Sequence, residues 1–167
     1  MLHCDNLTCN SGTDTVLDTS GNVGFNTSVT IGADGLGIVS YLDQTNERLK
    51  VLHCNDVLCT SGIASTPDNG SCGGRDTSIT IGVDNLGLVS YGDSCGSDLK
   101  VLHCSDVACN QGTVTILDSL GSVGGFTSIN IGGDGLGLVS YIDGSNGDLK
   151  GFHCSNVTCS PFIRVGR

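Results

Sequence analysis

The 167-residue chain contains no tryptophan, one methionine and two prolines, and aromatic residues make up only 4% of it. Charged residues are scarce as well, at 14%, whereas 38% of the residues are hydrophobic. This balance excludes an intrinsically disordered chain, which has few apolar and many charged residues. The 26 glycines and ten cysteines exclude a helical bundle rich in leucine and alanine. The composition therefore predicts a cross-linked, loop-rich, all-β protein.

Basic side chains and long apolar runs are also few. Seven Lys and Arg stand against 17 Asp and Glu, which gives a net charge of −10. Such a surface repels nucleic-acid phosphates and anionic lipid headgroups. Residues 36–39 form one of the longest apolar runs, whereas a membrane-spanning helix needs about 20 such residues. We therefore predict no nucleic-acid partner and no membrane insertion.

The ten cysteines form an even set, which favours disulfide bonds. Eight of them form pairs five residues apart, and the last two make a fifth pair: Cys4/Cys9, Cys54/Cys59, Cys104/Cys109, Cys154/Cys159 and Cys72/Cys95. Because disulfides persist in oxidising compartments, we predict a secreted, extracellular protein. The first ten residues lack the basic and apolar regions of a secretory signal, so we expect any export signal to be removed or to lie outside this sequence.

Four Asn-X-Ser/Thr triplets agree with secretion and mark the chain as a candidate glycoprotein. The candidate attachment sites are Asn6, Asn26, Asn69 and Asn156. In a chain rich in Ser, Thr and Asn, such triplets also arise by chance.

A gapless 50-residue repeat dominates the sequence, and its clearest marker is a His-Cys pair that begins at His3 and recurs three times. Within a unit, apolar and polar residues alternate over residues 28–31, and Asp34-Gly35 follows as a hairpin turn. This pattern predicts four short antiparallel strands per unit. We place the first two strands at 28–31 and 36–41, the third at 149–154 and the fourth around 114–117, each in the unit where its pattern is clearest. A last copy of the fourth strand is expected at 162–165.

The motifs T-S-I-x-I-G-x-D-G-L, L-V-S-Y-x-D and D-L-K-V-L-H-C resemble those of tandem β-propeller-type blade repeats in uncharacterised bacterial and environmental secreted proteins. The resemblance covers nearly the whole chain and implies a β-propeller-like fold of four-stranded antiparallel blades, but no activity. A stacked β-solenoid is the alternative architecture.

The repeat also predicts how the chain is divided. We expect one repeat array over residues 1–167, with a partial blade at 1–26, blades at 27–76 and 77–126, and a last blade with a C-terminal tail at 127–167. A closed propeller typically needs four to eight blades, so open blade edges must find hydrogen-bond partners. Self-association into a ring or a filament supplies them, and the alternative is that the chain is an excerpt of a longer one.

Several repeated side chains are candidate binding residues. Asp143, Ser145 and Asp148 offer oxygen ligands beside glycines, as a calcium site requires, although the same residues are ordinary turn formers. The repeated His-Cys pairs raise a zinc alternative, but adjacent residues on a strand point to opposite faces. Three tyrosines recur at equivalent positions and are candidates for stacking on sugars, although a packed aromatic is the commoner outcome in a strand: Tyr41, Tyr91 and Tyr141.

Catalytic motifs are lacking. The segment from Asp18 to Gly21 only faintly resembles the Asp-box of sialidase-type propellers, because its glycine falls one place late and the tryptophan is absent. We see no paired acids at one cleft and no arginine cluster. We therefore predict a non-catalytic, disulfide-stapled structural repeat protein without a cofactor, whose partners are copies of itself. A lectin-like module that binds glycans is the alternative, and a fragment of a propeller glycosidase is a less favoured one.

Overall fold

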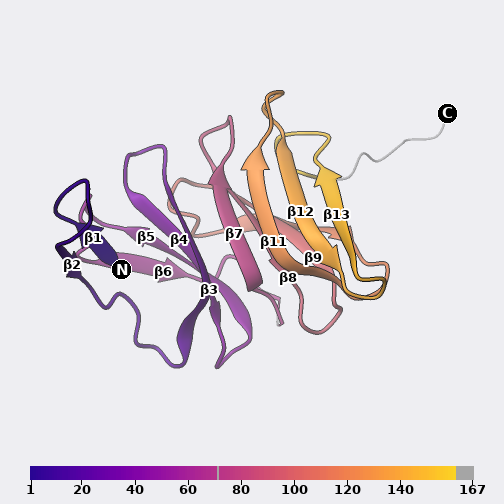
Figure 1. Cartoon of the computed structure of the whole chain (residues 1–167), viewed down its shortest axis with the longest axis horizontal. Helices are drawn as coiled ribbons and strands as arrows, with labels where there is room; N and C mark the ends of the chain where they lie inside the picture. Colours follow the sequence, from indigo (N-terminus) through magenta and orange to yellow (C-terminus); the bar gives the residue numbers. More distant parts are fainter. Residues whose placement is uncertain (71, 161–167) are drawn as a thin grey trace.

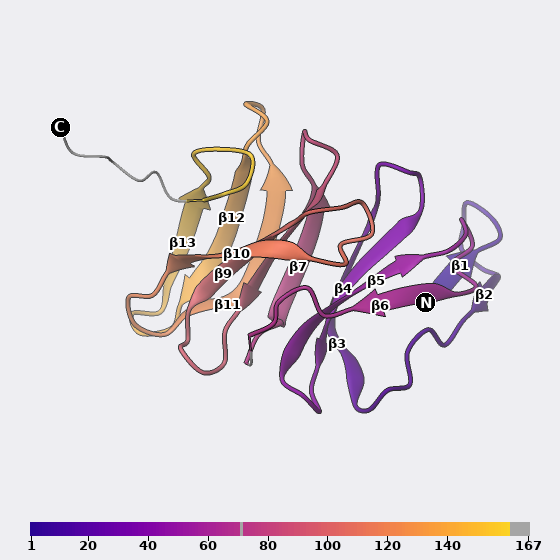
Figure 2. The ribbon, with the colours of Figure 1, turned by 180° about the vertical axis from the view of Figure 1, so that it is seen from behind.

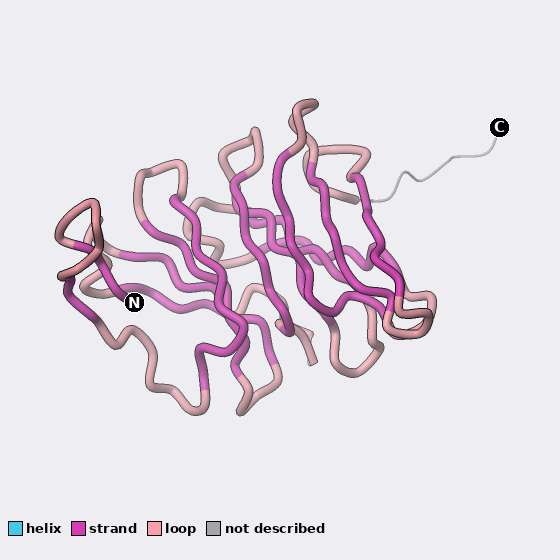
Figure 3. Tube along the Cα trace, viewed as in Figure 1, coloured by secondary structure: helices cyan, strands magenta, loops and turns pink. Residues whose placement is uncertain are grey.

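The computed structural model describes residues 1–70 and 72–160, and these residues form strands, turns and loops (Figures 1 and 3). The strands build four antiparallel sheets that follow one another along the longest axis of the molecule, from β1 and β2 at one end to β13 at the other. The described residues include no helix that could span a membrane.

Each sheet takes its strands in sequence order, so every connection within a sheet joins neighbouring strands. The first sheet has two strands, β1 (Leu2–Cys4) and β2 (Gly12–Asp14). The second has four, β3 (Val23–Ile31), β4 (Gly37–Asp43), β5 (Arg48–Cys54) and β6 (Gly62–Ser65). The third also has four, β7 (Arg75–Ile81), β8 (Gly87–Gly92), β9 (Leu99–Cys104) and β10 (Gly112–Asp118). The last has three, β11 (Val123–Ile131), β12 (Gly137–Asp143) and β13 (Asp148–His153).

The all-β, tandem antiparallel architecture predicted from the repeat is confirmed. The first strand of each unit is longer than predicted, so the expected divisions after residues 26, 76 and 126 fall inside β3, β7 and β11. The strand expected at 162–165 lies outside the described residues.

An irregular stretch explains why the first strand was predicted to be short. The pairing of β3 with β4 shifts register between Val23 and Ser28, and Gly24 and Asn26 in that stretch have positive φ angles of 88° and 51°. The equivalent positions at the start of the next two units, 74 and 76 and then 124 and 126, also have positive φ. Bulges of this kind break the alternation of inward and outward side chains, which is the signal that marks a strand in a sequence.

The sheets pack face to face, and β7 lies between β3 and β11 (Figures 1 and 2). The third sheet, β7–β10, is called the middle sheet because an apolar core covers each of its faces. The core on one side joins it to β4 and β5 and includes Ile38, Leu49, Val51, Ile79, Val89, Tyr91 and Leu102. The core on the other side joins it to β11–β13 and includes Leu88, Leu99, Val101, Val123, Ile129, Val139 and Tyr141.

Glycine allows the sheets to approach closely at one repeated position. A Cβ atom added to Gly74 would lie 2.8 Å from the Leu49 Cα atom of the preceding sheet, and one added to Gly124 would lie 2.8 Å from the Leu99 Cα atom. A Cβ atom added to the equivalent Gly24 would meet nothing within 4 Å, because no sheet of the described chain packs against it. The glycine is therefore required by contact between sheets as well as by its positive φ.

We predict that Gly124→Ala destabilises the protein more than Gly24→Ala. Both changes place a side chain at positive φ, at a cost of about 1 kcal/mol. Only Gly124→Ala also forces two sheets apart, which adds roughly 1–3 kcal/mol. Thermal unfolding of the two variants in dilute solution tests this difference, and equal losses would contradict it.

Candidate functional site

The ten cysteines are joined in the five predicted pairs, and none is free: Cys4–Cys9, Cys54–Cys59, Cys72–Cys95, Cys104–Cys109 and Cys154–Cys159. Four bridges close the loop after the third strand of a unit, and the Cys72–Cys95 bridge ties the loop before β7 to the β8–β9 loop. The zinc alternative is corrected, because a sulfur in a disulfide is not a thiolate ligand. Many disulfides are typical of extracellular proteins.

The second cysteine of three loop bridges has a place in the fold that the sequence analysis did not predict. Cys59, Cys109 and Cys159 are buried members of the apolar cores. Each has a positive φ, between 52° and 54°, and its backbone N–H bonds to the carbonyl oxygen three residues earlier at 3.0–3.1 Å. This tight turn directs the sulfur of a surface loop inward. The spacing of the cysteines indicated the bridge, but the loop conformation that buries it leaves no periodic signal.

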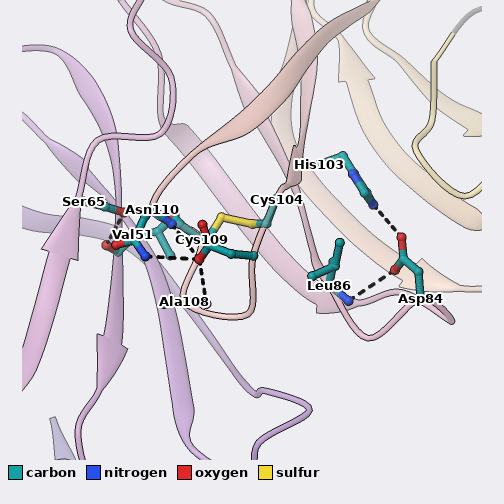
Figure 4. The surroundings of a disulfide bond; sticks show 10 residues. Val51, Ser65, Asp84, Leu86, His103, Cys104, Ala108, Cys109 and Asn110 are labelled. Carbon is teal, nitrogen blue, oxygen red and sulfur yellow. Dashed lines mark hydrogen bonds and ion pairs between the residues drawn. A yellow bond between two sulfur atoms is a disulfide. The ribbon is translucent and has the colours of Figure 1, made fainter.

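The histidines beside these bridges pair with aspartates of the hairpin turns. The His103 Nε2 atom lies 2.7 Å from Asp84 Oδ2, and the other oxygen of Asp84 accepts a hydrogen bond from the Leu86 backbone N–H (Figure 4). Equivalent pairs join His53 to Asp34 at 2.9 Å and His153 to Asp134 at 2.8 Å. Each pair thus pins the turn between the first two strands to the third strand.

The three repeated tyrosines are buried, with exposed fractions of 4% or less. The Tyr91 hydroxyl donates a 2.7 Å hydrogen bond to the buried Asp68 carboxylate, and burial raises the Tyr91 pKa far above its usual value. Tyr41 and Tyr141 make the same bond, at 2.7 Å, to Asp18 and Asp118. The tyrosines therefore anchor the segment that enters each of the three larger sheets, and their use in sugar stacking stays a prediction.

Lysines complete two of these anchors. Lys50 pairs with Asp18, and Lys150 pairs with Asp118. Burial by itself raises the pKa of Asp18, but hydrogen bonds from Lys50, Ser20 and Tyr41 outweigh it and hold that pKa well below 3.8. In the middle sheet Lys100 pairs with Asp93 instead.

The three candidate calcium ligands lie in the β12–β13 connection and serve the turn itself. Asp143 accepts a 3.0 Å hydrogen bond from the Asn146 side chain, which lowers the Asp143 pKa most. The backbone N–H groups of Ser145, at 3.0 Å, and Asn146, at 3.2 Å, also donate to Asp143 and lower its pKa. The Ser145 hydroxyl accepts a 2.8 Å bond from the Ser122 N–H, and Asp148 pairs with Asp143 across the ladder. Calcium binding at this turn stays a prediction.

The candidate glycosylation sites occupy different environments. The Asn6 amide nitrogen donates to Asn10 and Ser11, and that of Asn156 donates to the Ser160 carbonyl oxygen, so both brace a disulfide loop. The Asn26 amide donates to Asp76 at 3.0 Å. Asn69 is exposed, but its triplet includes Ser71, which lies outside the described residues.

Two apolar sheet faces, one on the β3–β6 sheet and one on the β11–β13 sheet, are the strongest candidates for a functional surface. We call the first the leading groove. It lies on the face of the β3–β6 sheet that turns away from β7, and it encloses about 400 Å³. Its lining residues are Met1, Thr15, Val16, Leu17, Asp18, Val23, Gly24, Thr27, Val29, Val39, Tyr41 and Leu52.

The second candidate surface, the trailing face, is the side of the β11–β13 sheet that turns away from β8 and β9. Leu149 on this face is 84% exposed, whereas the equivalent Leu49 and Leu99 are fully buried beneath the next sheet. Leu138 is 50% exposed, against 0% for the equivalent Ile38. The trailing face thus keeps leucines at core positions, and no described residue buries them there.

The sequence analysis missed both faces because it looked for unpaired backbone groups at the edges of sheets and did not consider exposed side chains on their faces. The repeat itself carries the signal, since a residue that is core in one unit has equivalents in the others. Comparison of Leu49, Leu99 and Leu149 by register points to an uncovered face once it is known that, within the described residues, no sheet follows β11–β13.

No protein-family model and no curated protein matches this chain. The crystal structure of a protein of unknown function from Dyadobacter fermentans DSM 18053 has a similar fold, with a TM-score of 0.64 and 16% sequence identity. The match covers 84% of this chain and 40% of that one, so this chain spans well under half of that protein's length. The similarity shows the fold alone.

We predict that Tyr91→Phe lowers the free energy of unfolding by about 2 kcal/mol, because it removes a donor from a buried carboxylate. Tyr141→Phe costs less, since Asp118 keeps Lys150 as a partner. Urea unfolding of both variants measures the difference. A Tyr141→Phe loss as large as that of Tyr91→Phe would contradict this account of the anchors.

The low pKa values of Asp18 and Asp118 make stability depend on acid pH. The unfolded chain takes up these protons near pH 3.8, before the folded chain does, so the contribution is complete above that pH and is lost as the pH falls toward the folded-state pKa values. We expect Asp18→Asn to flatten the decline in stability between about pH 4 and pH 2. Unfolding curves across this range check it, and an unchanged slope would contradict it.

Proposed function

We propose that this protein is a secreted, non-catalytic structural module that self-assembles from tandem β-repeats in a propeller-like arrangement into a ring or an extracellular filament. One observation carries the proposal: the β3–β6 and β11–β13 sheets each expose apolar side chains on one face, and the equivalent positions of other units are buried between sheets. Contiguous exposed apolar surface of this kind is typical of interaction sites.

The packing supports the propeller-like part of the proposal. The first strands of successive units, β3, β7 and β11, lie next to one another, and each sheet extends away from them (Figure 2). Further copies of the sheet added at either end continue the same arrangement. A heterologous contact repeated in this way closes into a ring or continues into a filament, according to the rotation at each step.

The acidic residues favour a structural role over a catalytic one. Asp18, which lies in the segment that faintly resembles an Asp-box, is held by Tyr41 and Lys50, and the equivalent Asp118 by Tyr141 and Lys150. A carboxylate engaged in this way is a structural anchor and is not poised to act on a substrate. The glycosidase and lectin alternatives gain no support from the buried tyrosines and paired acids.

We predict that the mass of the particles rises with protein concentration in multiples of the 17.0 kDa chain. Raising the salt concentration strengthens association, because chains of net charge −10 repel one another and salt screens that repulsion. Sedimentation velocity at several concentrations and ionic strengths measures both effects. A compact monomer under all these conditions would overturn the proposed function.

A further inference from the structure

We propose that the trailing face of one chain docks into the leading groove of a second copy, and that the β1–β2 sheet of the receiving chain leaves its place when this happens. The inference rests on the proposed self-assembly and specifies its partner, its polarity and the segment that moves. The chain already contains two sheet-to-sheet contacts, between β3–β6 and β7–β10 and between β7–β10 and β11–β13, which we call joints. The inference follows from the contacts that repeat in these two joints.

The internal joints define the apolar contacts of the new one. Leu49 lies against Gly74, and Leu99 lies against Gly124. One repeat further on, Leu149 is 84% exposed, and Gly24 has no neighbour within 4 Å of its added Cβ atom. Leu149 of one copy and Gly24 of another are therefore the two unmatched halves of a contact that this chain makes twice.

The polar contacts of the joints repeat in the same register. The Ile79 N–H donates to Ser28 Oγ at 3.2 Å, and the Ile129 N–H donates to Ser78 Oγ at 3.1 Å. The equivalent pair in the new joint is the Val29 N–H with the Ser128 hydroxyl of the second copy.

A pair of buried hydroxyls follows the same rule. Thr127 lies 2.8 Å from Ser90, and Thr77 donates to Ser40. The new joint would bring Thr27 against Ser140 of the second copy. Ser140 is exposed, whereas the equivalent Ser40 and Ser90 are fully buried.

The β1–β2 sheet stands in the way of this docking. By the 50-residue register, Met1 takes the place of Val51 and His3 that of His53, so β1 is the counterpart of β5, β9 and β13. Met1 lines the leading groove. A docked β13 and the resident β1 would therefore claim the same position.

The strand pairings indicate that β1, and not the docked β13, is displaced. β1 pairs only with β2, over three residue pairs, whereas β13 is held to β12 by six pairs within one hairpin. The Cys4–Cys9 bridge lies wholly inside the β1–β2 segment, so the segment can leave without breaking a covalent bond. Asp18, bound to Tyr41 and Lys50, keeps the following linker in place.

Hydrogen exchange of the full chain tests the displacement. When the concentration is raised until the chain associates, we expect the amides of β3 and β12–β13 to exchange more slowly and those of β1 and β2 to exchange faster. Slower or unchanged exchange in β1 and β2 upon association would overturn the displacement.

A mixing experiment tests the head-to-tail polarity. Val29→Arg blocks the leading groove and Leu149→Arg blocks the trailing face, and both residues are exposed in the isolated chain, so both variants should fold. We expect each variant alone to be monomeric and an equal mixture to form a dimer of twice the chain mass, because each supplies the face that the other lacks. Val57→Arg, at an exposed position of a disulfide loop outside both faces, is the control and should associate like the wild type.

The outcomes separate this inference from the proposed function. A wild-type chain that never associates refutes the proposed function. A wild-type chain that associates while both arginine variants also associate refutes the docking faces. A mixture that stays monomeric refutes the head-to-tail polarity, because a symmetric contact between like faces is not rescued by mixing.

Discussion

The three larger sheets, β3–β6, β7–β10 and β11–β13, carry apolar side chains on both faces, and their stability depends on neighbouring sheets that cover those faces. The middle sheet meets this condition fully, with Tyr91, Leu99 and Val101 entirely excluded from solvent. Burial of one leucine side chain contributes about 2 kcal/mol, so a face that carries several such residues dominates the energetics of a joint. The β3–β6 and β11–β13 sheets retain the same pattern but expose apolar side chains on one face, and this difference is the basis of the proposed self-assembly.

Polar side chains fix the position of the sheets that the apolar faces hold together. The His–Asp pairs tie each hairpin turn to the third strand, and the Tyr–Asp bonds tie the entering segment to the second strand. The pairs recur at the same repeat positions, so each unit carries its own set of constraints. Apolar faces are tolerant of sliding, whereas charge-assisted hydrogen bonds need one geometry, and together they give a single register.

The sequence was sufficient to predict the strands and the disulfides because both depend on short-range patterns. Alternation over residues 28–31 and the Asp34-Gly35 turn place a hairpin, and cysteines five residues apart leave little choice of partner. The beginning of β3 could not be predicted, because the bulge around Asn26 hides the alternation. The burial of Cys59, Cys109 and Cys159, the burial of the tyrosines and the exposure of Leu149 could not be predicted either. Whether a residue faces core or solvent depends on the next sheet in space.

Every disulfide of this chain closes a loop within one sheet and its flanking loops, and none crosses from one sheet to the next. The covalent cross-links therefore place no limit on how many units stand in a row. Duplication or loss of a whole 50-residue segment of the gene would leave each cysteine with its own partner, so such arrays can change length during evolution without a stage in which bridges are mismatched.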